Sequence, residues 1–131
     1  MKICIFGADG RSGVEVVKYA HQKGYEVFAF VYSDSSNKFF PEGTKIIKGD
    51  VMNYDDVFSA IDGVDAVISV LGHIKGSDPL MQTKGMINIV KAMNDRGVKR
   101  ILSLTGTGAR VENDTPSIVD IFLNSIVKLV D

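Results

Sequence analysis

The sequence predicts an α/β fold, a doubly wound parallel sheet of five strands in the order 3-2-1-4-5. Apolar segments of strand length alternate with segments of helical periodicity along the chain, which is typical of parallel sheets. Residues 26–31 are apolar almost throughout, as expected of a strand that is buried on both faces of such a sheet. Residues 2–6 lead through a glycine-rich turn straight into a helix-like segment, which is how doubly wound folds commonly begin.

The apolar pattern and the residues that start or stop helices place each element. The predicted strands are residues 2–6, 26–31, 45–48, 66–71 and 99–104. The predicted helices are residues 14–23, 54–61, 79–96 and 116–130, and residues 32–44 and 105–115 are predicted loops. The helix boundaries rest on Gly24 and Gly97 as stops, on Asn53 or Asp55, Asp78 and Thr115 as N-caps, and on Pro79 near the start of its helix.

The last predicted helix, residues 116–130, is apolar on nearly every side. A helix that covers a sheet needs only one apolar stripe, so this one requires cover on more than one side. The chain then stops at Asp131 without a glycine or proline terminator. We therefore expect the C-terminal part of the domain to be missing from this chain, or a second subunit to cover the helix in a homo-oligomer.

Size and composition favour a soluble globular protein. The 131 residues suffice for one domain with a core and are too few for two, so residues 1–131 are predicted to form a single domain. The net charge of −1 and the pI near 6.1 argue against a nucleic acid or an anionic membrane as partner. No apolar run approaches the roughly 18 residues of a membrane span, and no secretory leader is recognised. We expect a cytoplasmic location.

The sequence gives no sign of cysteine or metal chemistry. The single cysteine, Cys4, lies within the first predicted strand, which favours a buried and unreactive thiol. There is no cluster of cysteine and histidine residues with metal-ligand spacing, no P-loop and no Gly-x-Ser-x-Gly elbow. These patterns point away from metal, P-loop and serine-hydrolase chemistry.

The glycine-rich turn predicts a dinucleotide site. Gly7, Gly10 and Gly13 follow the first strand and precede a helix. Gly7 permits a tight turn, Gly10 lets the backbone approach a pyrophosphate, and Gly13 lets the helix pack close to the strand. The N-terminus of the helix then offers N–H groups and a partial positive charge to the anion.

The end of the second strand bears on the choice between NAD and NADP. An acidic residue there binds the ribose 2′-hydroxyl of NAD, whereas a basic residue accepts the 2′-phosphate of NADP. Tyr32 is neither, and Asp34 comes two residues later, where a loop position is favoured. Arg11 in the glycine turn either pairs with a 2′-phosphate or is solvated at the helix start. On this basis we expect a slight preference for NADP over NAD.

Three further strand ends carry candidate site residues. Asp50, after the third strand, either accepts the adenine amino group or serves as a turn or capping residue. Gly72 and His73 follow the fourth strand, where ligands bind in open α/β sheets. Thr105 and Thr107 follow the fifth strand, beside the expected redox ring of a dinucleotide. His73, Thr105 and Thr107 are the candidate catalytic residues, although loop histidines are more often solvated.

Taken in order, these motifs resemble the atypical short-chain dehydrogenase/reductases, and among them the NmrA-like group that includes the flavin reductase and biliverdin reductase type. The resemblance runs over residues 1 to about 110. It is carried by residues 5–13, 24–27, 49–51, 63–72, 85–90 and 97–100, which read IFGADGRSG, GYEV, GDV, GVDAVISVLG, GMINIV and GVKR. This family has the Rossmann fold and binds NAD(P).

The resemblance assigns roles to particular residues. The pyrophosphate would be held by Gly7, Gly10, Arg11, Ser12 and Gly13. Asp50 and Val51 would contact adenine, and Leu71 and Gly72 would line the ribose and nicotinamide side. Asp9 and Tyr32 complete the predicted set of cofactor-binding residues.

The chain departs from the family pattern at three places. Relatives that prefer NADP often carry arginine at the position of Tyr32. The serine that relatives place after the fifth strand falls on Gly106, between the two threonines, and no Tyr-x-x-x-Lys pair follows. Relatives also continue for several elements that wall the substrate pocket, beyond the point where this chain ends.

The resemblance implies an NAD(P)H-dependent reductase that transfers hydride to a small-molecule acceptor such as a flavin or quinone. The alternative is a non-catalytic dinucleotide sensor of the NmrA type that regulates a protein partner. Fold alone does not establish the reaction. A different nucleotide binder, such as a methyltransferase, is disfavoured by the glycine spacing and by Asp50 and Val51.

Overall fold

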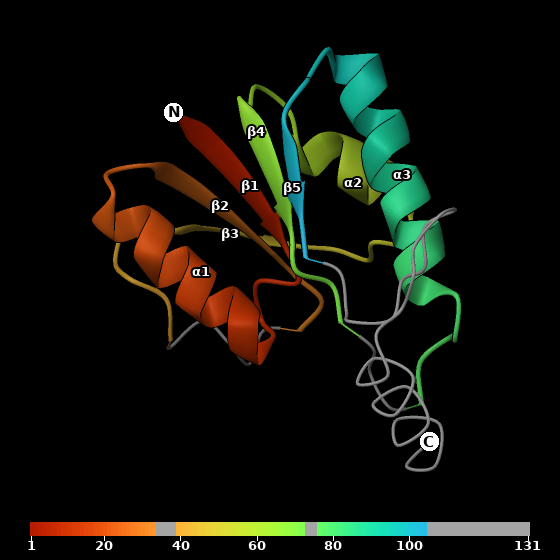
Figure 1. Ribbon diagram of the computed structural model, residues 1–131, viewed down its shortest axis with the longest axis horizontal. Helices are drawn as coiled ribbons and strands as arrows, with labels where there is room; N and C mark the ends of the chain where they lie inside the picture. The colour runs from red at the N-terminus through yellow and green to blue at the C-terminus, as the bar shows by residue number, and fades with distance from the viewer. Residues whose placement is uncertain (34–38, 73–75, 105–131) are drawn as a thin grey trace, which may run out of the picture.

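Five parallel strands form one sheet with helices on both of its faces (Figure 1). The computed structural model describes residues 1–33, 39–72 and 76–104. The strands are β1 (Lys2–Phe6), β2 (Glu26–Val31), β3 (Lys45–Lys48), β4 (Ala66–Ser69) and β5 (Ile101–Ser103). Their order across the sheet is β3-β2-β1-β4-β5 and every adjacent pair is parallel. The predicted fold class and strand order are therefore confirmed.

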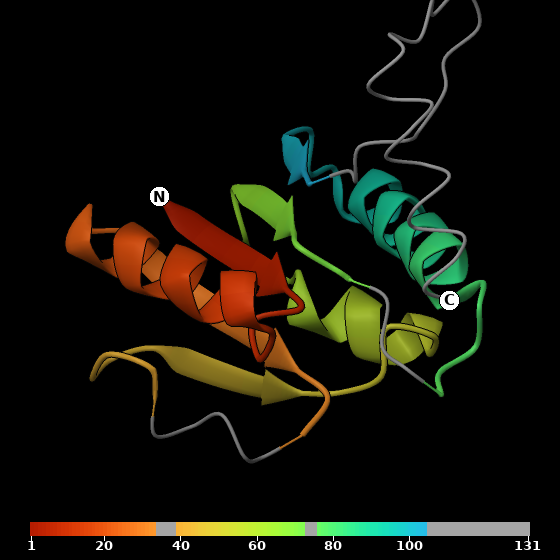
Figure 2. The same cartoon turned by 60° about the horizontal axis from the view of Figure 1, so that its bottom comes forward.

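Three helices pack on this sheet within the described residues. They are α1 (Arg11–Gln22), α2 (Tyr54–Ala60) and α3 (Met81–Arg96). Helix α1 covers one face, and α2 and α3 lie together on the other (Figures 1 and 2). None of them is long and apolar enough to cross a membrane. The predicted helix 116–130 and the predicted loop 105–115 lie outside the described residues.

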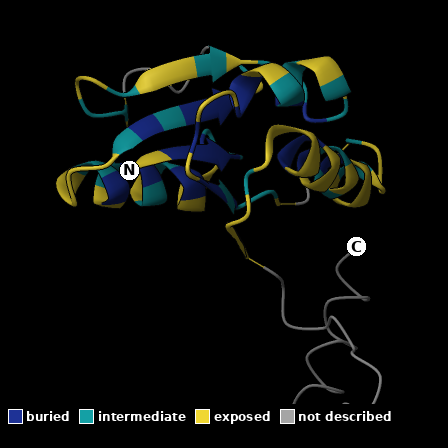
Figure 3. Cartoon of the chain, turned by 90° about the horizontal axis from the view of Figure 1, so that it is seen from above, coloured by how far each residue is buried: buried dark blue, intermediate teal, exposed yellow. Residues whose placement is uncertain are grey.

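The alternation of side chains along β1 divides the core into two clusters. Ile3 and Ile5 pack with Val17 and Ala20 of α1, whereas Cys4 and Phe6 pack on the opposite face with residues of α2 and α3. All four β1 side chains are buried, because a central parallel strand is covered on both faces. Figure 3 shows the middle of the sheet in the colour of buried residues and much of the outer helix surface in that of exposed ones.

The thiol of Cys4 is inaccessible to solvent, as predicted. Its exposed fraction is 0%, and burial raises its pKa to about 12, because the low-dielectric core disfavours the charged thiolate. A thiol that stays neutral is a poor nucleophile. Cys4 is therefore a packing residue.

Several predicted boundaries differ from the structure, in each case near a turn. Helix α1 begins at Arg11, three residues earlier than predicted, because Gly10 is extended and serves as the N-cap. Strand β4 ends at Ser69 and β5 runs only over Ile101–Ser103, so both are shorter than predicted. Helix α3 begins at Met81 with Leu80 as N-cap, so Pro79 precedes the helix. Of the two candidate caps of α2, Asn53 is the N-cap, with its side chain accepting from the Asp55 amide.

Candidate functional site

A cleft of about 700 Å³ opens at the carboxyl ends of β1, β2, β3 and β4. The glycine turn after β1 forms one wall, and the segment that enters α3 forms the other. Ten of the eleven predicted cofactor-binding residues line it: Gly7, Asp9, Gly10, Arg11, Ser12, Tyr32, Asp50, Val51, Leu71 and Gly72. The eleventh, Gly13, lies buried directly beneath the turn. The topology thus brings residues from four strand ends to one place.

The geometry of the glycine turn requires small residues at Gly7 and Gly13. Gly7 has a φ of +76°, a conformation that L side chains rarely adopt. A Cβ at Gly13 would lie 2.0 Å from the carbonyl oxygen of Gly7 and 2.7 Å from the Cα of Ala8. Helix α1 therefore rests directly on the turn, and this close packing fixes the start of the helix at the edge of the cleft.

The N-terminus of α1 faces the cleft without a side chain to cap it. Gly10 is the N-cap and makes no side-chain capping bond, and the first turn contains no acidic residue. The first amides of any helix lack intrahelical acceptors. Arg11 and Ser12, the first two helical residues, are both exposed in the cleft wall. Together with the helix dipole, this arrangement suits a bound anion such as a pyrophosphate.

Asp9 links the glycine turn to the end of β2. Its Oδ2 accepts hydrogen bonds from the amides of Tyr32 at 3.1 Å and Ser33 at 3.4 Å. The amide of Ala8 also donates to the carbonyl of Phe30 at 3.3 Å. The cleft wall at this point is therefore built from two segments that lie more than twenty residues apart in the chain. Tyr32 itself is 68% exposed at the cleft.

Asp50 serves as a turn residue in the structure. Its Oδ1 accepts from the amide of Met52 at 2.8 Å, while its own amide donates to Asp56 at 2.9 Å. These contacts hold the loop between β3 and α2 in place. The turn role that the sequence left open is thus observed, and the proposed contact of Asp50 with adenine stays a prediction.

Helix α3 supports the floor of the cleft from behind. A Cβ on Gly85 would lie 2.9 Å from the side chain of Val51 and 3.4 Å from that of Leu71, so the helix approaches both residues closely. Asn88 donates to the carbonyl of Val51 at 3.0 Å, and Gln82 donates to the carbonyl of Leu71 at 2.9 Å. The positions of Val51 and Leu71 therefore depend on α3.

The wall opposite the glycine turn was not predicted from sequence. Ser77, Asp78 and Met81 line it where the chain enters α3. Asp78 accepts from the Leu80 amide at 2.8 Å and from Lys84 at 2.6 Å. The bond from Lys84, followed by that from the Leu80 amide, lowers the pKa of Asp78 below its ordinary value. Asp78 was predicted as the N-cap of this helix, but the N-cap is Leu80, and Asp78 instead binds the Leu80 amide in the turn before the helix. Its place beside the cleft, which the sequence pattern did not predict, depends on the β4-to-α3 crossover.

Five further residues line the cleft, and two of them directly follow a strand. The five are Phe30, Gly49, Met52, Val70 and Gly76. Gly49 directly follows β3, and a Cβ there would lie 2.7 Å from the ring of Phe30. The rule that ligands bind at the carboxyl ends of parallel strands could have identified Gly49 and Val70. The candidate catalytic residues His73, Thr105 and Thr107, and also Asp34, lie outside the described residues.

The chain matches the model of a family described as NAD(P)H-binding, over residues 7–128. This chain belongs to that family. The match includes the glycine turn and every strand end that contributes to the cleft. The resemblance drawn from the sequence motifs is therefore confirmed at the level of an NAD(P)-binding, Rossmann-like family.

The chain is also similar to known proteins over most of its own length. YwnB of Bacillus subtilis is 31% identical over 109 residues, which is 83% of this chain and 49% of YwnB. The isoflavone reductase homolog A622 of Nicotiana tabacum is 30% identical over 77% of this chain and 34% of its own length. The oxidoreductase YlbE of Lactococcus lactis has the same fold, with a TM-score of 0.74 at 23% identity over 95% of this chain and 57% of that one. The chain thus spans about a third to a half of the length of these two sequence relatives.

Proposed function

We propose that this chain binds NAD(P)H in the cleft and takes part in hydride transfer to a small-molecule acceptor. The observation that carries the proposal is the convergence of the glycine turn, the uncapped N-terminus of α1 and three further strand ends on one cleft. Membership of an NAD(P)H-binding family supports the same ligand class. The match to an isoflavone reductase homolog supports reductase chemistry in particular.

Each wall of the cleft suits a different part of a dinucleotide. The amides of Arg11 and Ser12 at the start of α1 suit the pyrophosphate. Asp50 and Val51 at the end of β3 suit adenine, and Leu71 and Gly72 after β4 suit the ribose and nicotinamide side. The bound cofactor would supply the hydride, which the acceptor takes up together with a proton. The role of the chain is to bind and orient the two partners.

The proposed acceptor is a flavin or a quinone, because both take up a hydride and a proton and present a flat ring. His73, Thr105 and Thr107 are proposed to border the nicotinamide through positioning or hydrogen bonds. In a complex, a nicotinamide lying more than about 8 Å from all three would exclude direct contact, since a hydrogen bond needs about 3 Å.

Steady-state oxidation of NADPH and NADH with a panel of flavins and quinones tests the reaction. Turnover with one of these acceptors that depends on the protein would support a reductase. Tight binding of the dinucleotide without turnover on any acceptor would instead favour the non-catalytic sensor. Absence of binding for both dinucleotides would contradict the proposed function itself.

A further inference from the structure

Among the residues that the structure describes, none that directly follows β2 is the carboxylate that commonly selects NAD in this type of fold. A carboxylate at the end of the second strand ordinarily accepts the ribose 2′-hydroxyl. Here β2 ends at Val31, and the next side chain is that of Tyr32, which has no charge and is 68% exposed. The position after β2 therefore does not explain how the chain distinguishes a 2′-hydroxyl from a 2′-phosphate.

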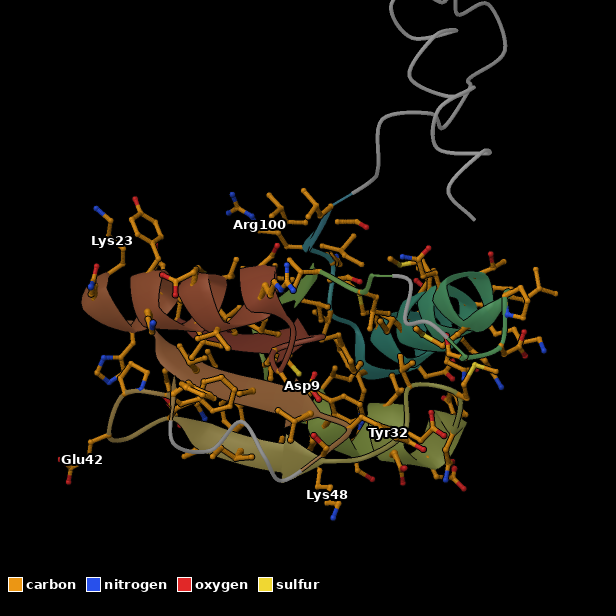
Figure 4. All side chains as sticks on the ribbon, turned by 90° about the horizontal axis from the view of Figure 1, so that it is seen from below. Asp9, Lys23, Tyr32, Glu42, Lys48 and Arg100 are labelled. Atoms are coloured by element: carbon orange, nitrogen blue, oxygen red, sulfur yellow. The ribbon has the colours of Figure 1, made fainter. Side chains whose placement is uncertain are left out.

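Asp9 brings a carboxylate to this position from a different part of the chain. It belongs to the glycine turn, yet its Oδ2 accepts from the amides of Tyr32 and Ser33, the two residues that follow β2. Asp9 and Tyr32 both line the cleft. Figure 4 shows them close together at the carboxyl end of the sheet, away from Lys23 and Glu42.

We propose that Asp9 determines the ribose specificity of this chain and selects NAD over NADP. This inference rests on the proposed function. The two amides hold the carboxylate at the end of β2 through Oδ2, so Oδ1 is the oxygen that would accept the ribose 2′-hydroxyl. The glycine turn thereby supplies the acceptor that the second strand supplies in other chains.

The charge of Asp9 gives the selection its direction. A 2′-phosphate at this place would put a second anion beside the carboxylate, and like charges a few ångströms apart repel strongly where water is partly excluded. Arg11 would favour a 2′-phosphate instead, because its positive charge lies two residues further along the chain and is exposed at the same cleft wall. Two hydrogen bonds tie Asp9 to the end of β2, so its carboxylate is held at the place where a ribose 2′-hydroxyl is ordinarily bound.

The test compares NADH and NADPH affinities by fluorescence titration of the parent protein and of Asp9→Asn. Asparagine keeps a side-chain oxygen that can accept from the Tyr32 amide but carries no charge. The parent should bind NADH about tenfold or more tightly than NADPH, and Asp9→Asn should bring the two affinities close to equality, mainly by improving NADPH binding. Asp65→Asn is the matched control, since Asp65 also accepts a backbone amide, that of Lys2, at the opposite end of the sheet.

Three outcomes would overturn the assignment. The first is a parent protein that binds NADPH as tightly as NADH or more tightly, which is the result expected if Arg11 pairs with the 2′-phosphate. The second is an Asp9→Asn variant that changes both affinities by the same factor, because that indicates only a structural role. Since the parent ratio is measured without any substitution, the proposal can be tested even if the variant unfolds. The third, binding of neither dinucleotide by the parent, would contradict the proposed function together with this assignment.

Discussion

Gly13 is the residue at which the glycine turn tolerates least change. A Cβ there would lie 2.0 Å from the Gly7 oxygen and 2.7 Å from the Cα of Ala8, and these two atoms belong to backbone that cannot move aside easily. We expect Gly13→Ala to lower the free energy of unfolding by about 1–3 kcal/mol or more, as overpacking of a close contact does. Urea unfolding followed by circular dichroism measures this loss.

Gly10→Ala is the matched control for that substitution. Gly10 has a φ of −74°, and a new Cβ there would lie 3.3 Å from the Gly7 oxygen. A small shift relieves that contact, so the loss of stability should be much smaller than for Gly13→Ala. Equal losses at the two positions would show that the packing of α1 on the turn is not what requires glycine at position 13.

At the scale of single residues, spacing predicted the glycine turn but not the partner of Asp9. The roles of Gly7 and Gly13 follow from their positions between a strand and a helix, which are local in sequence. The bonds from Asp9 to Tyr32 and Ser33 join segments 23 and 24 residues apart. Such contacts depend on which strands are adjacent and on where each strand ends. Sequence reasoning predicted the adjacency of β1 and β2 but did not predict the turn conformation.

At the scale of elements, the cap of α2 supports the loop that carries Asp50 and Val51. The side chain of Asn53 accepts from the Asp55 amide at 3.0 Å. We expect Asn53→Ala to lower the free energy of unfolding by about 0.5–2 kcal/mol, the usual cost of losing an N-cap. Ser59→Ala, at an exposed position of the same helix, should change stability by less than about 0.5 kcal/mol. Denaturant unfolding of both variants measures these changes. Equal losses of unfolding free energy in the two variants would argue against a stabilising role for the Asn53 cap.

The contribution of Asp78, at the entrance to α3, to the stability of the fold should depend on pH. Lys84 and the Leu80 amide lower the pKa of Asp78 below the ordinary value of 3.8. A carboxyl whose pKa is lower in the folded state stabilises the fold above its unfolded pKa, and this contribution is lost as the pH falls through the folded pKa. Asp78→Asn should therefore lower Tm at pH 7, and the difference from the parent should shrink as the pH falls below about 4. Thermal unfolding across this range measures it, and a difference independent of pH would contradict the role of the charge.

The elements themselves were predictable, while their ends were less so. The strand order and the cap of α2 followed from apolar runs, short connections and an asparagine before a helix. The early start of α1 could not be deduced, because Arg11 and Ser12 are polar and exposed and Gly13 has no side chain, so these three residues give no apolar periodicity. The short β5 likewise reflects its place at the edge of the described sheet, where all three of its residues are exposed.

At the scale of the whole molecule, an apolar groove of about 790 Å³ runs between α3 and the β4–β5 edge. Ile87 and Leu104 line it and are 60% and 61% exposed. Leaving such side chains in water forgoes about 1.5–3 kcal/mol each. This is a large share of a typical stability of about 5–15 kcal/mol. We therefore expect the apolar groove between α3 and β5 to be covered by another part of the chain or by a second subunit.

We predict that the 131-residue chain does not behave as a self-sufficient monomer. Its apolar segment 116–130 and the exposed side chains of α3 and β5 should associate with a second copy, or the amides of residues 116–130 should exchange rapidly and the chain should aggregate. Light scattering together with hydrogen exchange of this chain measures both properties. A clean monomer in which residues 116–130 are well protected would show that the prediction is wrong.

If the glycine turn holds a dinucleotide, a large side chain at Gly10 should block its binding. Valine at position 10 would place a branched side chain where the pyrophosphate must approach, while the φ of −74° allows the fold to persist. Gln22→Val, at the far and exposed end of α1, is the control. The measurement is the affinity for NADH and NADPH by fluorescence titration, with circular dichroism to establish folding. We predict a loss of about tenfold or more for Gly10→Val and parental affinity for Gln22→Val. Unchanged affinity for both dinucleotides in a folded Gly10→Val protein would show that the glycine turn does not hold the pyrophosphate.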